Sequence, residues 1–140
     1  MEEIAIFISV VSLVLAYWSR KIAEKANNIT RHHYQLEIYD VFLELRSYIE
    51  NTLNLNSNEI QKYKYLFRNT KFYFDNEFVI NLEKYYQNCF SFAVLDRRCK
   101  ENLRNGEAVE EIRHKQDSLE KERDQLLTDI EKQFNKDLKI

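Results

Sequence analysis

The chain has 140 residues and a formal net charge of −2 at pH 7, with 21 Lys and Arg against 23 Asp and Glu. This near balance steers it to no particular class of partner. Gly occurs once and Pro never, so turn residues are scarce and long helices are expected. The aromatic share of 14% argues against a disordered tail and favours packed helices.

The first element along the chain is an uncharged run of sixteen residues at positions 4–19, IAIFISVVSLVLAYWS. Nine of the sixteen are Ile, Leu, Val or Phe, and together they favour the bilayer by roughly 3 to 5 kcal/mol. As a helix the run is about 24 Å long, somewhat short of a hydrocarbon core of about 30 Å. We predict a short, single membrane-spanning helix.

Three other interpretations fit this run less well. A cleaved signal peptide has positive charge before its apolar run and small residues at its end, whereas here Glu2 and Glu3 precede the run and YWSR ends it. An interfacial helix has a charged face, which this run lacks. A buried helix of a soluble protein has a similar length. Cleavage and burial stay open as alternatives.

The flanking charges predict an orientation for the membrane-spanning helix. The nearby basic residues all follow the run: Arg20, Lys21, Lys25 and Arg31. The positive-inside rule therefore places the N-terminus outside and the rest of the chain in the cytoplasm. Tyr17 and Trp18 are typical of an aromatic belt, so we expect them to lie at the membrane interface together with Arg20 and Lys21.

The small residues of this region share one track along the helix. The steps between them alternate between four and three residues, and the track comprises Ala5, Ser9, Ser12, Ala16, Ser19, Ala23, Ala26 and Thr30. We call this track the small-residue seam. A period of 3.5 residues draws helices into a left-handed supercoil, and small side chains let helix backbones approach closely in lipid.

Because the chain has one candidate span, the partner of the small-residue seam must be another chain, and a homo-oligomer is expected. Two geometries fit. Either the seam is buried between neighbouring helices, or its serines line a polar lumen. A chance arrangement of residues that are common in spanning helices is the alternative.

The predicted fold is all-α. Residues 1–30 form the membrane-spanning helix with its juxtamembrane extension, and residues 31–140 form a cytoplasmic bundle of three to four helices. A new helix can begin at Asn28 or Thr30, either of which can act as its cap. Apolar residues then recur at helical spacing over positions 32–53.

The middle of the chain contains a turn and a short helix. Residues 51–58 (NTLNLNSN) are rich in Asn and predict a turn. Asn56 and Glu59 resemble a capping box at the start of a shorter helix. Residues 71–74 (KFYF) are expected to form an apolar connector, with a short strand as the alternative.

Two long helices complete the prediction. Asp75 is expected to cap the first, with Phe74 stapled onto Val79, and Gly106 is expected to end it. The second covers about residues 108–138 and packs back along the domain. The basic residues near the end of the first helix favour the helix dipole or a solvated face over nucleic-acid or lipid contact: Arg97, Arg98, Lys100 and Arg104.

The sequence carries no recognisable reaction chemistry. Cys89 and Cys99 form neither a CxxC motif nor a disulfide framework, so we expect reduced, buried thiols. His32 and His33 are adjacent and point to different faces of a helix, and His114 is alone among charges. No phosphate loop, nucleophile elbow or zinc spacing occurs. We predict a protein that is not an enzyme, with no catalytic residue, metal site or cofactor and no evident nucleic-acid site.

The layout of IAIFISVVSLVLAYWSRK followed by a helical pattern resembles small bacterial membrane proteins of phage defence. It is similar in architecture to the membrane accessory family of type VI-B CRISPR systems, described as an oligomeric pore with a domain like the HEPN nucleases. The resemblance implies a bacterial inner membrane and a role in antiviral defence. The HEPN hallmark, Arg followed by His after four to six residues, does not occur here, which places RNA cleavage in doubt.

These observations leave three hypotheses for the function. The leading one is a single-pass inner-membrane protein that self-associates through the small-residue seam and acts on the bilayer as a pore or depolarising accessory. The first alternative is a membrane-tethered adaptor whose helical domain docks a cytoplasmic protein or ribonucleoprotein. The second is a degenerate membrane-bound HEPN-type nuclease, which needs an Arg and a His brought together by folding.

Overall fold

The computed structural model describes residues 2–139, and within that range the chain is helical without any strand. The elements follow in the order α1 (Glu2–Asn51), α2 (Ser57–Leu66), the 3₁₀ helix η1 (Phe67–Phe72), α3 (Asn76–Asn105) and α4 (Glu110–Leu138). This confirms the predicted all-α class, with a long apolar N-terminal helix followed by a helical bundle. The chain divides into two compact units, Met1–Tyr34 and Gln35–Ile140.

The N-terminal unit is helical throughout its described residues, and α1 passes through Asn28 without a break. The predicted new helix start at Asn28 or Thr30 is therefore wrong. The Thr30 hydroxyl donates to the Ala26 carbonyl at 3.0 Å, so it serves a residue within the same helix and caps nothing. Because no Gly or Pro interrupts this stretch, two asparagines alone do not end the helix.

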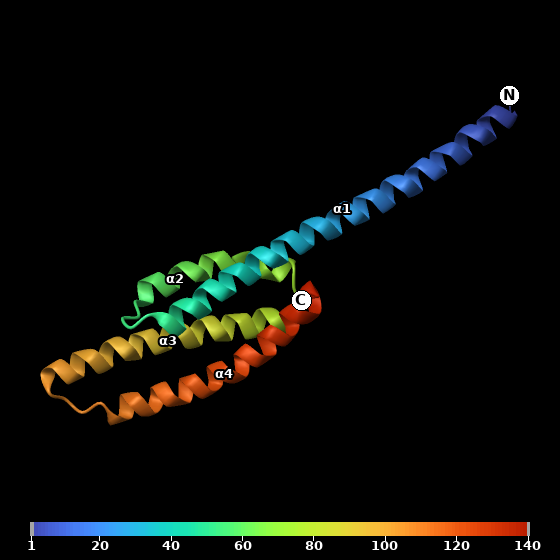
Figure 1. The fold of residues 1–140 in the computed structure, drawn as a ribbon. Helices are drawn as coiled ribbons and strands as arrows, with labels where there is room; N and C mark the ends of the chain where they lie inside the picture. The colour runs from blue at the N-terminus through green and yellow to red at the C-terminus, as the bar shows by residue number, and fades with distance from the viewer. Residues whose placement is uncertain (1, 140) are drawn as a thin grey trace. The chain divides into compact units, whose positions relative to one another are not determined.

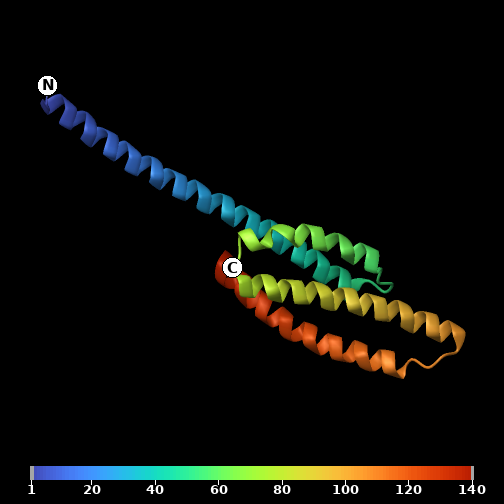
Figure 2. The same cartoon turned by 180° about the vertical axis from the view of Figure 1, so that it is seen from behind.

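The second unit is a bundle in which successive helices run in opposite directions (Figures 1 and 2). The part of α1 from Gln35 onward leads into the Asn-rich turn, α2 and η1 return beside it, and α3 and α4 form a long antiparallel pair. The segment predicted as an apolar connector is η1 as far as Phe72, so the strand alternative for this segment is wrong.

Aromatic rings make up the centre of the bundle core. Phe134 of α4 is completely buried, and its ring centroid lies 4.9 Å from that of Tyr39 and 5.4 Å from that of Phe42, both on α1. On its other side lie Phe78 at 4.8 Å and Phe74 at 5.5 Å. Edge-to-face pairs of this kind add to the stabilisation that burial alone gives. One side chain therefore joins three segments of the chain.

Both ends of α3 confirm the prediction from sequence. The Asp75 carboxylate accepts from the Phe78 backbone N–H at 2.8 Å, as an N-cap does. At the other end Gly106 has a φ of +71°, and the Glu107 N–H donates to the Asn102 carbonyl at 2.8 Å. This is a Schellman ending, which needs the left-handed conformation that Gly adopts readily. The Phe74 ring stacks over Phe78, at 4.3 Å between centroids.

The capping box predicted at Asn56 forms only in part. The Asn56 side-chain oxygen accepts from the Asn58 N–H at 2.9 Å, so Asn56 does cap α2. Its own N–H donates to the Tyr48 hydroxyl at 2.9 Å, and Glu59 pairs with Lys62 instead of reaching back. The tertiary contact with Tyr48 satisfies the donor that Glu59 was expected to satisfy.

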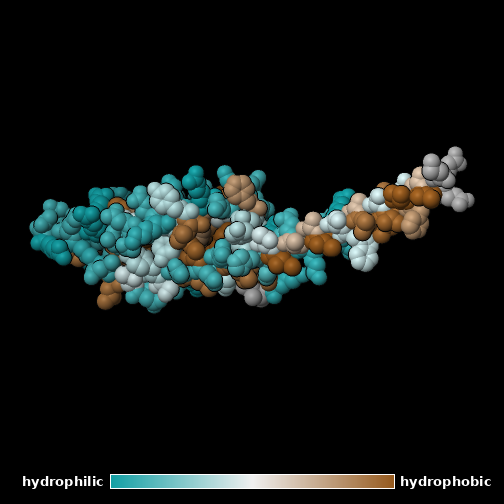
Figure 3. Space-filling view, turned by 90° about the horizontal axis from the view of Figure 1, so that it is seen from above, coloured by the Kyte–Doolittle hydropathy of each residue, from teal (hydrophilic) through white to brown (hydrophobic). Residues whose placement is uncertain are grey.

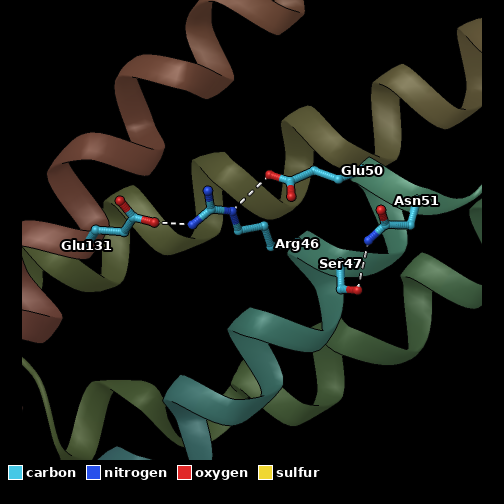
Figure 4. A network of polar contacts seen from close by, with 5 residues as sticks. All are labelled: Arg46, Ser47, Glu50, Asn51 and Glu131. Carbon is cyan, nitrogen blue, oxygen red and sulfur yellow. Dashed lines mark hydrogen bonds and ion pairs between the residues drawn. The ribbon is translucent and has the colours of Figure 1, made fainter.

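Polar contacts connect α1 to the other helices of the bundle. Arg46 lies between Glu50 of its own helix, at 2.8 Å, and Glu131 of α4, with which it also forms an ion pair (Figure 4). The hydrogen bond with Glu50 is the main cause that raises the pKa of the Arg46 guanidinium. Nearer the N-terminus of α1, the Gln35 side chain donates to the Tyr73 carbonyl at 2.9 Å. These contacts fix which faces of the helices meet.

Replacing Phe134 with Ala is expected to lower the free energy of unfolding by about 3 to 5 kcal/mol, because a fully buried ring with four aromatic neighbours leaves a cavity. Urea titration of the detergent-solubilised protein, followed by far-UV circular dichroism, measures the change. Leu53→Ala is the matched control, since Leu53 is 91% exposed and the change should stay within about 0.5 kcal/mol. Equal losses in the two variants would contradict this account of the core.

Candidate functional site

The first candidate site is the outer surface of the N-terminal segment. Every side chain from Ile4 to Tyr34 is exposed in the single chain. The exposed fraction of the large apolar side chains up to Trp18 ranges from 39% at Val11 to 71% at Leu13. Figure 3 shows this segment brown along much of its length, whereas the visible face of the bundle is mainly teal. An uncovered apolar surface of this extent marks a contact with lipid or other helices.

The helix is long and apolar enough to cross a membrane, and none of its most apolar window is buried within the chain. Tyr17 and Trp18, predicted at the interface, are both exposed. Arg20, predicted beside them, donates from Nε to the Glu24 carboxylate at 3.0 Å, and both side chains are largely exposed. An exposed ion pair of this kind contributes little to stability, so the Arg20 side chain can still contact lipid headgroups. Lys21 is exposed as well.

The small-residue seam lies on this exposed helix, and two of its serine hydroxyls donate to carbonyl groups of the same helix. The Ser9 hydroxyl donates to the Ala5 carbonyl at 2.9 Å, and the Ser12 hydroxyl donates to the Ile8 carbonyl at 2.8 Å. A hydroxyl that donates to its own helix presents little volume and no unsatisfied donor. The seam can therefore contact another helix closely without the cost of a buried, unpaired group.

A second notable feature, which the sequence did not reveal, is a cation inside the bundle. Arg123, a polar residue within the apolar stripe of α4, is only 9% exposed. Its guanidinium carbon lies 4.6 Å from the centroid of the Phe92 ring on α3, which is a cation–π contact. Glu120 is 3.9 Å away. The cue in the sequence was an Arg between Leu119 and Leu126 on an apolar stripe.

Cys89 and Tyr85 lie close to Arg123 in the same region. Burial raises the pKa of the Cys89 thiol to about 12, against the opposing effect of the Arg123 charge. Burial also raises the pKa of the Tyr85 hydroxyl. Both groups are therefore neutral at physiological pH. A neutral buried thiol is a poor nucleophile, so this cluster has a structural character and does not resemble a reactive cysteine site.

A groove with a volume of about 440 Å³ lies between α2 with η1 and α3. Its apolar wall includes Val79, Leu82 and Tyr86 from α3. Basic residues from α2 and η1 also line it: Lys64, Arg68 and Lys71. The sequence of residues 60–74 indicates a basic and aromatic surface, because it contains four basic residues, no acidic residue and six aromatic residues. The prediction from sequence did not include this surface.

In the other basic cluster, near the end of α3, Arg97, Arg98 and Arg104 are exposed and Lys100 is half-buried. Arg97 pairs with Glu101 at 3.0 Å along the exposed helix surface. Lys100 pairs with Asp96 at 2.7 Å and donates to the Leu53 carbonyl at 2.7 Å. Lys100 thus holds the α1–α2 turn against α3, and the cluster has a structural explanation.

The histidines and cysteines of residues 2–139 do not gather into a metal site. Within that range no group of three or more His, Cys, Asp or Glu residues is placed to hold a metal ion. His32, His33 and His114 are all exposed. Cys89 and Cys99 are free and buried, as predicted.

The fold and the exposed segment define the class of this chain: an all-α protein whose long apolar N-terminal helix can cross a membrane. Comparison with protein-family models, with curated proteins and with solved structures finds no match.

The raised pKa of Cys89 predicts a loss of stability at high pH. An unfolded thiol ionises near pH 8.5, whereas the folded one stays neutral to about pH 12. The stabilisation is complete below about pH 8.5 and declines as the pH rises, by at most about 1.4 kcal/mol per pH unit. Urea midpoints between pH 7 and 10 measure this slope. The Cys89→Ser variant, whose hydroxyl does not titrate in this range, should show a smaller slope of stability against pH. Identical slopes for the variant and the unmodified chain would contradict the prediction.

Proposed function

We propose that this chain is a single-pass protein of the bacterial inner membrane that self-associates through the small-residue seam and acts on the bilayer. The supporting observation is the pairing of two features on one helix. The large apolar side chains around residues 4–18 are uncovered in the single chain, and the hydroxyls of Ser9 and Ser12 on the seam are satisfied within the helix. Lipid covers the bulky sides, and neighbouring copies cover the small one.

The seam also limits how such an assembly can act. It is the track that carries the hydroxyls of Ser9, Ser12 and Ser19, while most remaining positions of the run are large and apolar. A ring of helices that conducts ions needs polar groups facing its lumen, so a pore requires the seam to face inward. Seams buried pairwise between helices produce a closed cluster. The two geometries share the same contact residues and differ in permeability.

The double substitution Ser12→Leu with Ala16→Leu is expected to block assembly, because two branched side chains on the seam hold the helix backbones apart. The concentration at which oligomers dissociate in mild detergent should rise at least about tenfold, the equivalent of 1.4 kcal/mol. Analytical ultracentrifugation or mass photometry measures the particle mass. Dye and potassium efflux from vesicles is measured on the same preparations.

The matched control is Val10→Leu with Val14→Leu, which adds two leucines at the same spacing away from the seam. This variant should assemble as the unmodified chain does. Oligomers and permeability that both survive the seam substitutions would refute the proposal. If the seam substitutions abolish both assembly and efflux, the result supports the pore geometry. If they abolish assembly and the unmodified chain causes no efflux, the result supports the closed cluster.

The adaptor hypothesis makes the opposite prediction about the N-terminal helix. If the helical domain acts by docking a cytoplasmic partner, residues 31–140 keep their activity when fused to an unrelated single-pass anchor. Under the seam proposal the same exchange abolishes activity, because the new anchor lacks the contact surface. Retained activity with monomeric particles would therefore favour the adaptor.

A further inference from the structure

The bundle carries a surface where exposed rings and basic side chains occur together, which we call the basic–aromatic patch. It consists of Lys64, Tyr65, Arg68, Lys71 and Phe72. The exposed fraction of Tyr65 is 71% and that of Phe72 is 67%. The Lys71 ammonium lies 5.1 Å from the centroid of the Phe72 ring, and all patch residues except Phe72 line one groove. Large exposed rings mark a contact surface when they gather with charges of one sign.

Basic residues outnumber acidic ones at the patch. The chain as a whole carries −2, yet residues 60–74 contain four basic residues and no acidic one. Lys62 is paired with Glu59 at 2.8 Å. Glu83 of α3 lines the same groove as Lys64, Arg68 and Lys71, but within residues 2–139 these three cations form no ion pair of 4 Å or less. The surface therefore keeps an excess of positive charge that complements an anionic partner.

The patch lies at the end of the bundle where the chain leads toward the apolar segment. Gln35, the first residue of the bundle unit, donates to the carbonyl of Tyr73, the residue next to Phe72. Arg20, at the predicted interface, precedes Gln35 by fifteen residues. That stretch spans about 22 Å as a helix and at most about 50 Å when fully extended. In a membrane-inserted chain this length keeps Gln35, whose partner Tyr73 adjoins the patch, within about 50 Å of the interface.

We infer that the basic–aromatic patch binds the anionic surface of the bilayer in which the chain is anchored. This inference rests on the proposed membrane span. Lys and Arg side chains are attracted to anionic headgroups, and aromatic rings favour the interfacial layer. The short tether gives the patch a high effective concentration at the surface, so a weak intrinsic affinity is enough for binding. We assign the lipid surface as the partner of the patch, because the segment between Arg20 and Gln35 tethers the bundle to the bilayer.

The test uses the full chain in vesicles with a Trp18→Phe background and one new indole, introduced by Phe72→Trp. Lipids with brominated acyl chains quench an indole that enters the interface. The fluorescence is expected to be quenched in vesicles that contain phosphatidylglycerol, and much less in pure phosphatidylcholine. Adding Lys64→Gln, Arg68→Gln and Lys71→Gln should weaken the contact about a hundredfold and abolish the quenching.

The matched control places the indole by Leu53→Trp instead, in the turn at the opposite end of α1 within the bundle. Leu53 is more exposed than Phe72, so quenching there would show nonspecific collapse onto lipid and overturn the inference. An indole at position 72 that stays unquenched in anionic vesicles overturns it as well, as does a response to single-stranded RNA in place of lipid. Carbonate extraction of the same vesicles separates the two proposals, since release of the protein refutes the membrane span itself.

Discussion

An uncovered apolar helix surface is the constraint on which the rest of this molecule depends. Water penalises such a surface in proportion to its area, and within the single chain nothing covers residues 4–18. Lipid and neighbouring helices are the two covers that the side chains fit. Bulky aliphatic residues suit acyl chains, and a track of Ala and Ser suits a close helix contact. What covers this surface decides whether the chain is soluble, where it is located and whether it assembles.

The bundle unit has a separate hydrophobic core. The Phe134 ring contacts aromatic side chains from α1, from α3 and from the segment before α3, and the ion pair between Arg46 and Glu131 connects α1 to α4. The core of this unit contains no residue of the N-terminal segment. Under the inferred lipid contact, the apolar segment and the basic–aromatic patch would give the chain two separate contacts with a bilayer.

The sequence predicted the parts of this structure that depend on local chemistry. The apolar run, the Asp75 cap and the Gly106 ending each follow from residue types within a few positions of one another. It failed where distant contacts decide: Tyr48 takes the role expected of Glu59, and Phe92 allows Arg123 to be buried. The helix start expected near Asn28 failed for a local reason, because two asparagines without Gly or Pro do not end a helix. The basic–aromatic patch could have been found from residues 60–74, but its exposure depends on how α2 and η1 lie on α3.

The position of Phe134 has a consequence for the order in which the protein matures. Its ring partners on α1, Tyr39 and Phe42, leave the ribosome well before α4 does, because synthesis runs from the N-terminus. Until α4 emerges, both rings lack their contact with Phe134, although Phe42 can already meet Tyr85 of α3, its neighbour at 5.3 Å. Antiparallel α3 and α4 are neighbours in sequence and can pair quickly. The nascent chain therefore exposes more of its core, and is more open to aggregation, before its last helix is made.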